Sequence, residues 1–232
     1  MAKASVRRSP KARGGFTLIE AALATVIVGV GIVAMVDAQQ AFIRSNMWSS
    51  HAATGTFLAN EIRELTRHLP KHDPVTGLYL EADGNGNSTL RGWGRENGEV
   101  SVLDFDDLDD FDGVSFSFFG PSGLDDGQYA GPINAFGEVI PNISIDGEVA
   151  IRDEQTGVVE PMIGWTQNVL VQKVDPFNTS VVVANGAWEP ALGNFAGRAV
   201  HEYPLRVTVE VTYQGPMAIN PEVVARVTWI VP

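Results

Sequence analysis

Apolar residues form one long uninterrupted run near the start of the chain, and this run predicts a membrane-spanning helix. From Phe16 to Val36 the only charged residue is Glu20. A helix of that length extends roughly 31 Å, which is enough to cross the hydrocarbon core of a bilayer. Basic residues precede the run and Asp37 follows it. By the positive-inside rule we therefore expect a single-pass segment over residues 16–36, with its N-terminus in the cytoplasm.

After this run the pattern becomes that of an amphipathic helix. Apolar residues and one threonine recur at intervals of three, four or seven, which places them along one face of a helix. The members of this stripe are Ile43, Met47, Thr54, Leu58, Ile62, Leu65 and Leu69. Pro70 then ends the pattern. The sequence therefore predicts one helix over residues 16–69, whose second part, residues 37–69, is amphipathic and needs a globular partner.

From residue 70 to residue 232, short apolar runs alternate with Gly, Pro, Asn and Asp, which predicts a single β-rich head. The clearest strand shows strict alternation, so that its apolar side chains face a core: Leu205, Val207, Val209, Val211 and Tyr213. An antiparallel sheet of this kind needs cover on one face, and the helix stripe can supply it. The expected fold class is α+β, with a long N-terminal helix packed on an antiparallel sheet. Strands are expected at residues 114–119, 169–174, 205–213 and 223–231.

Composition narrows the classes of function. The chain has 28 acidic and 16 basic residues and a formal net charge of −12, which argues against a nucleic-acid-binding protein with a basic surface. It has no cysteine, which excludes disulfides, thiolate metal sites and a cysteine nucleophile. It also lacks a Gly-x-Ser-x-Gly elbow, a phosphate-binding loop and a dinucleotide fingerprint. We therefore expect a non-enzymatic protein without an organic cofactor.

The densest charge in the chain is a run of six aspartates within residues 104–112. Six carboxylates could hold Ca²⁺, which takes six to eight oxygen ligands, and Asp107 and Asp109 are the candidate ligands. The same segment carries an apolar residue at every third position: Phe105, Leu108 and Phe111. It can therefore also dock one apolar face and leave its acids in water. Charge runs are usually solvated, and we favour that interpretation.

Glu20 needs an explanation because it is a lone carboxylate about one turn inside an apolar run. An unpaired carboxylate in hydrocarbon costs at least about 2.5 kcal/mol, so a partner is expected. Cleavage after Gly15 would create one, because it exposes a positive amine on Phe16. That amine and Glu20 could pair between neighbouring copies and set their axial register.

The residues around this position carry a resemblance to a known family. Arg13-Gly14-Gly15-Phe16-Thr17-Leu18-Ile19-Glu20, followed by the apolar run, resembles the class III signal of type IV pilins and type II secretion pseudopilins. The continuation is more similar to minor pilins and minor pseudopilins than to major subunits. The resemblance covers residues 8–42. It implies that a prepilin peptidase cleaves between Gly15 and Phe16, that Phe16 is N-methylated, and that Glu20 acts in assembly.

The resemblance also implies a location, partners and an architecture. It divides the chain into a cleaved basic leader (residues 1–15), the helix (residues 16–69) and a periplasmic or extracellular head (residues 70–232). The protein would be inserted in the bacterial inner membrane and then join a pilus or a pseudopilus. Its partners would be the prepilin peptidase, other pilin-type subunits, an inner-membrane assembly platform and its ATPase. Two alternatives remain open: an uncleaved membrane-anchored envelope protein, and a secreted binding domain released by signal peptidase near Gln39.

Overall fold

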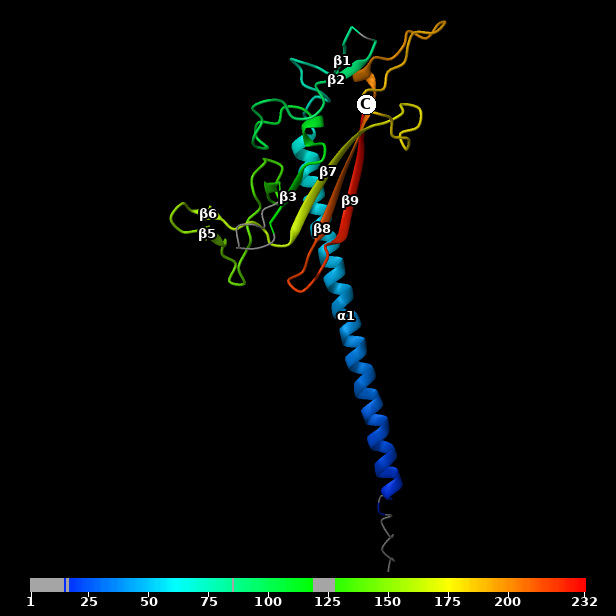
Figure 1. Ribbon diagram of the computed structural model, residues 1–232. Coiled ribbons are helices and arrows are strands. Elements are labelled where there is room, and N and C mark those ends of the chain that lie inside the picture. The colour runs from blue at the N-terminus through cyan, green and yellow to red at the C-terminus, as the bar shows by residue number, and fades with distance from the viewer. Residues whose placement is uncertain (1–14, 16, 85, 119–127) are drawn as a thin grey trace, which may run out of the picture. The chain divides into compact units, whose positions relative to one another are not determined.

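The computed structural model describes residue 15 and residues 17–84, 86–118 and 128–232. The chain divides into two compact units, Met1–Met47 and Trp48–Pro232. One long α-helix, α1 (Leu18–Thr66), contributes its first part to the first unit and its last turns to the second. All the strands that the structure describes lie in the second unit (Figure 1). The coarse α+β expectation is thus met.

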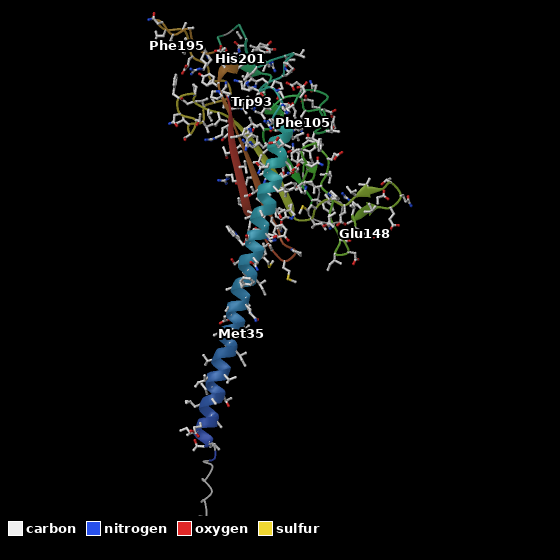
Figure 2. All side chains as sticks on the ribbon, turned by 180° about the vertical axis from the view of Figure 1, so that it is seen from behind. Met35, Trp93, Phe105, Glu148, Phe195 and His201 are labelled. Atoms are coloured by element: carbon white, nitrogen blue, oxygen red, sulfur yellow. The ribbon has the colours of Figure 1, made fainter. Side chains whose placement is uncertain are left out.

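In the first unit, α1 exposes its side chains in every direction. The helix continues without a break through Gly29, Gly31 and Asp37. Side chains project from all sides of the segment that carries Met35 (Figure 2). The helix is long and apolar enough to cross a membrane, and no residue in its most apolar window is buried. Its exposed large apolar residues include Leu18, Ile19, Leu23, Val26, Ile27, Val28, Val30, Ile32, Val33, Met35 and Val36.

The helix ends at Thr66 rather than at Leu69, the end expected from the sequence. Proline disfavours helical backbone at the residue before it, so Pro70 acts on Leu69 and not only on its own position. The last turn tightens accordingly, because the Leu69 N–H donates to the Thr66 carbonyl oxygen at 3.2 Å, a spacing of three residues. The apolar stripe therefore continues slightly beyond the regular helix.

The main sheet of the second unit has five strands, in the order β4-β3-β7-β8-β9. Figure 1 labels four of them, β3, β7, β8 and β9. Both neighbours of β8 are antiparallel to it, as expected for its pairing with β9. The pair β3–β4 is parallel, which corrects the expectation of a purely antiparallel sheet. Parallel neighbours need a longer connection than a hairpin, and no sequence pattern indicated that return. The bounds are β3 Ser115–Ser117, β4 Tyr129–Ala130, β7 Trp165–Lys173, β8 Leu205–Tyr213 and β9 Glu222–Val231.

Smaller elements decorate this sheet. Two short antiparallel pairs form separate two-stranded sheets: β1 (Tyr79–Ala82) with β2 (Ser88–Arg91), and β5 (Ile151–Asp153) with β6 (Val158–Val159). Glu148 lies beside the β5–β6 pair (Figure 2). Two single-turn 3₁₀ helices complete the described elements, η1 (Asp109–Phe111) and η2 (Val200–Glu202).

The alternation along β8 correctly predicted the core of the second unit. Four of its inward residues are fully buried: Leu205, Val207, Val209 and Val211. Tyr213 is partly buried against them. Leu58 and Ile62 of α1 belong to the same core, so the last turns of the helix cover this face of the sheet. The opposite face mixes polar and apolar residues: the Thr208 and Thr228 hydroxyls lie 3.1 Å apart, and Leu170 and Ile230 are exposed on the same face.

The helix stripe is therefore buried only in its second half. Leu58 and Ile62 are buried, whereas Ile43 and Met47, in the first unit, are 56% and 55% exposed. The apolar periodicity thus runs through both units, and its buried members Leu58 and Ile62 lie in the second unit.

Two contacts fix the last turns of α1 to the sheet. A Cβ at Gly55 would lie 2.7 Å from Val224 Cγ2 and 3.1 Å from Ala225 Cβ, so glycine allows the helix to approach β9 closely. Gln167 of β7 is fully buried, and its Nε2 donates to the carbonyl oxygens of Leu58 (2.8 Å) and Ile133 (3.0 Å). Its Oε1 accepts a hydrogen bond from the Ile133 N–H at 2.8 Å. One side chain thus joins the helix, the sheet and the loop that contains Ile133.

Candidate functional site

The segment around the expected cleavage position begins the helix. Gly15 is exposed, and Phe16, the expected methylated residue, lies outside the described residues. Thr17 precedes the first helical residue, and its hydroxyl accepts a hydrogen bond from the Glu20 N–H at 3.3 Å. Glu20 Oε2 in turn accepts from the Thr17 N–H and the Thr17 hydroxyl, each at 2.9 Å. This reciprocal arrangement is a capping box.

The capping box gives Glu20 a local role that the sequence analysis missed, although the Thr-x-x-Glu spacing is its signal. Glu20 is the third helical residue, so its carboxylate satisfies a backbone donor that would otherwise be unpaired at the helix start. Both bonds use Oε2, and Oε1 accepts none from the residues that the structure describes. The intermolecular pairing of Glu20 stays a prediction, and the cap is compatible with it.

The aspartate-rich segment is the second candidate, and it is folded differently from the favoured expectation. Its apolar residues dock as expected: Phe105, Leu108 and Phe111 are buried. Its acids do not all point to water, because Asp107, Asp109 and Asp110 are 0%, 0% and 1% exposed. The solvated interpretation was wrong for these three residues. The segment turns tightly into η1, and this turn brings neighbouring carboxylates inward together with the apolar residues.

Hydrogen bonds within the turn provide partners for one carboxylate oxygen of Asp107 and one of Asp110. Asp107 Oδ1 accepts from the N–H groups of Asp109 (2.9 Å) and Asp110 (3.1 Å). Asp110 Oδ2 accepts from the N–H groups of Asp106 (3.1 Å) and Asp107 (3.2 Å). Each carboxylate therefore spends one oxygen on the backbone of the turn, as short acidic side chains commonly do. The second oxygen of each is buried without a hydrogen bond from the described residues.

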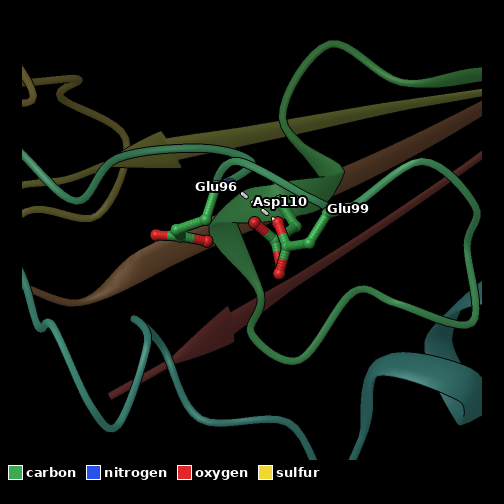
Figure 3. Close-up of side chains that lie close together, drawn as sticks. All are labelled: Glu96, Glu99 and Asp110. Carbon is green, nitrogen blue, oxygen red and sulfur yellow. Dashed lines mark hydrogen bonds between the residues drawn. The ribbon is translucent and has the colours of Figure 1, made fainter.

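Two glutamates from the preceding loop join these aspartates. Glu96, Glu99 and Asp110 each offer one carboxylate oxygen, and the three oxygens lie within 4.8 Å of one another (Figure 3). Asp106, Asp107 and Asp110 form a second triad with the same spacing, so Asp110 belongs to both. The Glu96 N–H donates to Glu99 Oε2 at 2.7 Å and holds the loop in this shape. We call these five residues the acidic pocket.

Glu96, Asp107 and Asp110 of the acidic pocket all have raised pKa values. Burial, together with the neighbouring carboxylates of Asp110, Glu99 and Asp107, raises the pKa of Glu96 to about 8. Burial also raises the pKa of Asp107 and of Asp110. The carboxylate of Asp109 contributes to the shift of Asp107, and the carboxylates of Asp107 and Glu99 contribute to the shift of Asp110. All these shifts disfavour the ionised forms, which is the expected result of placing like charges together away from water.

Asp109, one of the two sequence-predicted calcium ligands, faces a different set of groups. Its Oδ2 lies 2.6 Å from His72 Nδ1, and its Oδ1 accepts from the Gly94 N–H at 3.1 Å. Burial, aided by the positive charges of Lys71 and Lys173, lowers the pKa of His72 to about 4. The imidazole is therefore neutral at pH 7, and the contact is a hydrogen bond rather than an ion pair. Asp109 thus belongs to neither carboxylate triad, although its side chain lies beside that of Asp107 and raises the pKa of Asp107.

The sequence analysis missed the other members of the pocket. Glu96 and Glu99 were not singled out, because the loop that brings them to Asp110 has no periodicity to interpret. Asp106 and Asp110 were counted only as parts of an acidic run. The spacing of Glu96 and Glu99, three residues apart, is the one local signal that they could share a ligand.

Comparison with known proteins yields no relative. No family model matches the chain, no curated protein matches it, and no solved structure matches it.

Proposed function

We propose that this chain is a structural, non-enzymatic subunit of a pilin-type filament, namely a minor pilin of a type IV pilus or a minor pseudopilin of a type II secretion system. The observation that carries the proposal is the N-terminal segment. A prepilin-like signal is followed at once by a capped helix whose apolar side chains are exposed on every side. A surface of that kind needs a bilayer or other helices around it.

The properties of the helix suit both environments. Before assembly its apolar length suits a bilayer. After assembly the same side chains would pack against the helices of other subunits. Apart from the local backbone of the helix itself, no atom of the described residues lies within 4 Å of a Cβ placed on Gly29 or on Gly31, so both positions are open for close approach by another helix.

The leader and the charge near it define the order of events. The five bases of residues 1–15 would hold the leader in the cytoplasm until a prepilin peptidase cleaves between Gly15 and Phe16. Loss of the leader takes the formal side-chain charge from −12 to −17. The new amine on Phe16, once methylated, would pair with Glu20 of a neighbouring subunit. An assembly platform and its ATPase would then move the subunit into the filament, with its head in the periplasm or outside the cell.

Mass spectrometry of the N-terminus of the protein, isolated from cells that contain a prepilin peptidase, tests this proposal. We expect a chain that begins with N-methylated Phe16. As a control, the same protein from cells without the peptidase should keep Met1, because cleavage after Gly15 is expected from the prepilin peptidase alone. A chain that keeps Met1 in the presence of the peptidase would instead indicate an uncleaved anchor. A chain that begins near Gln39 would indicate a secreted domain.

A further inference from the structure

We propose that the acidic pocket, formed by Glu96, Glu99, Asp106, Asp107 and Asp110, binds one calcium ion. This inference does not depend on the filament function. It rests on carboxylate oxygens that the fold places together, four of which are buried without a hydrogen bond from the described residues.

The first support is the number of buried oxygens without a hydrogen bond. Asp107 Oδ2, Asp110 Oδ1 and both carboxylate oxygens of Glu96 are inaccessible and accept no hydrogen bond from the described residues. Asp107 and Asp110 are themselves almost completely buried. Buried polar atoms in folded proteins nearly always have a partner, and one cation can serve several carboxylate oxygens at the same place.

The second support is the missing counter-charge. Within the described part of the chain, no lysine, arginine or histidine pairs with Glu96, Glu99, Asp107 or Asp110. The nearby His72 pairs with Asp109 instead. Buried carboxylates must be neutralised by protons or by a cation, because like charges in a low dielectric repel strongly. A divalent ion neutralises two of them and supplies partners for the bare oxygens at once.

The geometry and the donor set favour calcium among the divalent cations. Calcium binds oxygen at 2.3–2.6 Å, so two ligands on opposite sides of one ion are about 5 Å apart. The oxygens of each triad lie within 4.8 Å of one another, and Asp110 connects the two triads. All the donors are carboxylates, which excludes the sulfur and nitrogen ligands that zinc prefers. Calcium also accepts irregular sets of six to eight oxygens, whereas magnesium requires a near-ideal octahedron.

The bound ion would fasten two parts of the head to each other. Glu96 and Glu99 lie in the loop that follows β2, whereas Asp107 and Asp110 belong to the turn around η1. Direct hydrogen bonds between the described residues of these two segments include those from Trp93 Nε1 to Asp112 and from the Gly94 N–H to Asp109, each at 3.1 Å. An ion shared by both would therefore hold the loop against the core residues Phe105 and Phe111.

Thermal unfolding of the full chain in detergent micelles, after removal of metal with a chelator, tests the site. Calcium at one hundred times its Kd should raise the Tm by about 5–10 °C, since an ion that binds only the folded state stabilises it by mass action. Asp110→Asn should abolish this shift. The asparagine oxygen can still accept from the N–H groups of Asp106 and Asp107, so the turn should keep its shape. Titration calorimetry should give one calcium ion per chain.

Asp104→Asn is the matched control, because Asp104 is an exposed aspartate of the same run that caps Ser101 outside the pocket. This variant should keep the full calcium shift. If Asp110→Asn does not fold, Glu96→Gln provides the second variant, with the same expected loss. No shift in the unaltered protein up to about 10 mM calcium, well above the range of extracellular calcium modules, would overturn the proposal. An equal shift in Asp110→Asn or an equal response to magnesium would also overturn it.

Discussion

Glu20→Ala should be cleaved and methylated normally but should be lost from filaments by at least about tenfold. The membrane helix can tolerate alanine, and the cleavage position at Gly15 is unchanged. What the variant loses is the carboxylate expected to pair with the amine of a neighbouring subunit, and a lost interaction of about 1.4 kcal/mol already lowers incorporation tenfold. The measurement is the amount of the subunit in sheared filaments, relative to the processed protein in the membrane.

The capping box makes a sharper version of this experiment possible, because it separates the charge from the cap. Glu20→Gln keeps an oxygen that can accept from the Thr17 N–H and hydroxyl, yet removes the negative charge. Thr17→Ala keeps the charge and weakens the cap. We expect Glu20→Gln to fail in assembly like Glu20→Ala, and Thr17→Ala to assemble. If Glu20→Gln assembles normally and Thr17→Ala does not, the cap and not the charge is what assembly requires.

Gln167→Leu should destabilise the head by about 2–5 kcal/mol. Leucine fills a similar volume but offers no partner to the N–H and carbonyl groups of Ile133, which is buried. Each buried backbone group left without a hydrogen bond costs about 1–3 kcal/mol. The third bond, to the Leu58 carbonyl oxygen, also disappears and weakens the attachment of α1 to β7. Denaturant or thermal unfolding of the full chain in detergent measures the change.

Gln172→Leu is the matched control on the same strand. Gln172 is partly exposed and accepts a hydrogen bond from Arg206 Nη2 at 2.7 Å, outside the core. Water can replace that bond, so the free energy of unfolding should change by less than about 1 kcal/mol. A loss for Gln167→Leu no larger than that of Gln172→Leu would show that the buried hydrogen bonds contribute little to holding the helix on the sheet.

The parts of the fold with a regular pattern could be predicted from sequence. Strict alternation located β8 and its buried face, because a strand with one solvated side repeats every two residues. The uninterrupted apolar run located the long helix, because a membrane-spanning helix needs about 20 apolar residues in succession. The parallel pairing of β4 with β3 had no such signal. No sequence pattern distinguishes Gly55 from a tolerated helical glycine, whereas in the structure a Cβ at this position would lie 2.7 Å from Val224 Cγ2.

The acidic pocket shows where sequence reasoning fails for a site. A run of aspartates is usually solvated, and that general rule gave the wrong burial for Asp107 and Asp110. The deciding feature was the tight turn around η1, in which backbone N–H groups bind one oxygen of each carboxylate and draw both inward. The two glutamates reach the same place only through the tertiary fold. At the other candidate site, the Thr-x-x-Glu spacing of Thr17 and Glu20 indicates the capping box, whereas the lone charge of Glu20 indicates only the intermolecular role.

The central claim is that the N-terminal helix assembles with the helices of other pilin-type subunits. Its most direct test is a photo-crosslinking amino acid in place of Val30, an exposed residue in the middle of the apolar segment. In cells that contain the assembly machinery, we predict crosslinks to the N-terminal helix of another pilin-type subunit, and their loss when Glu20→Ala is added. A processed chain that gives crosslinks to lipid alone, with or without Glu20, would contradict the account.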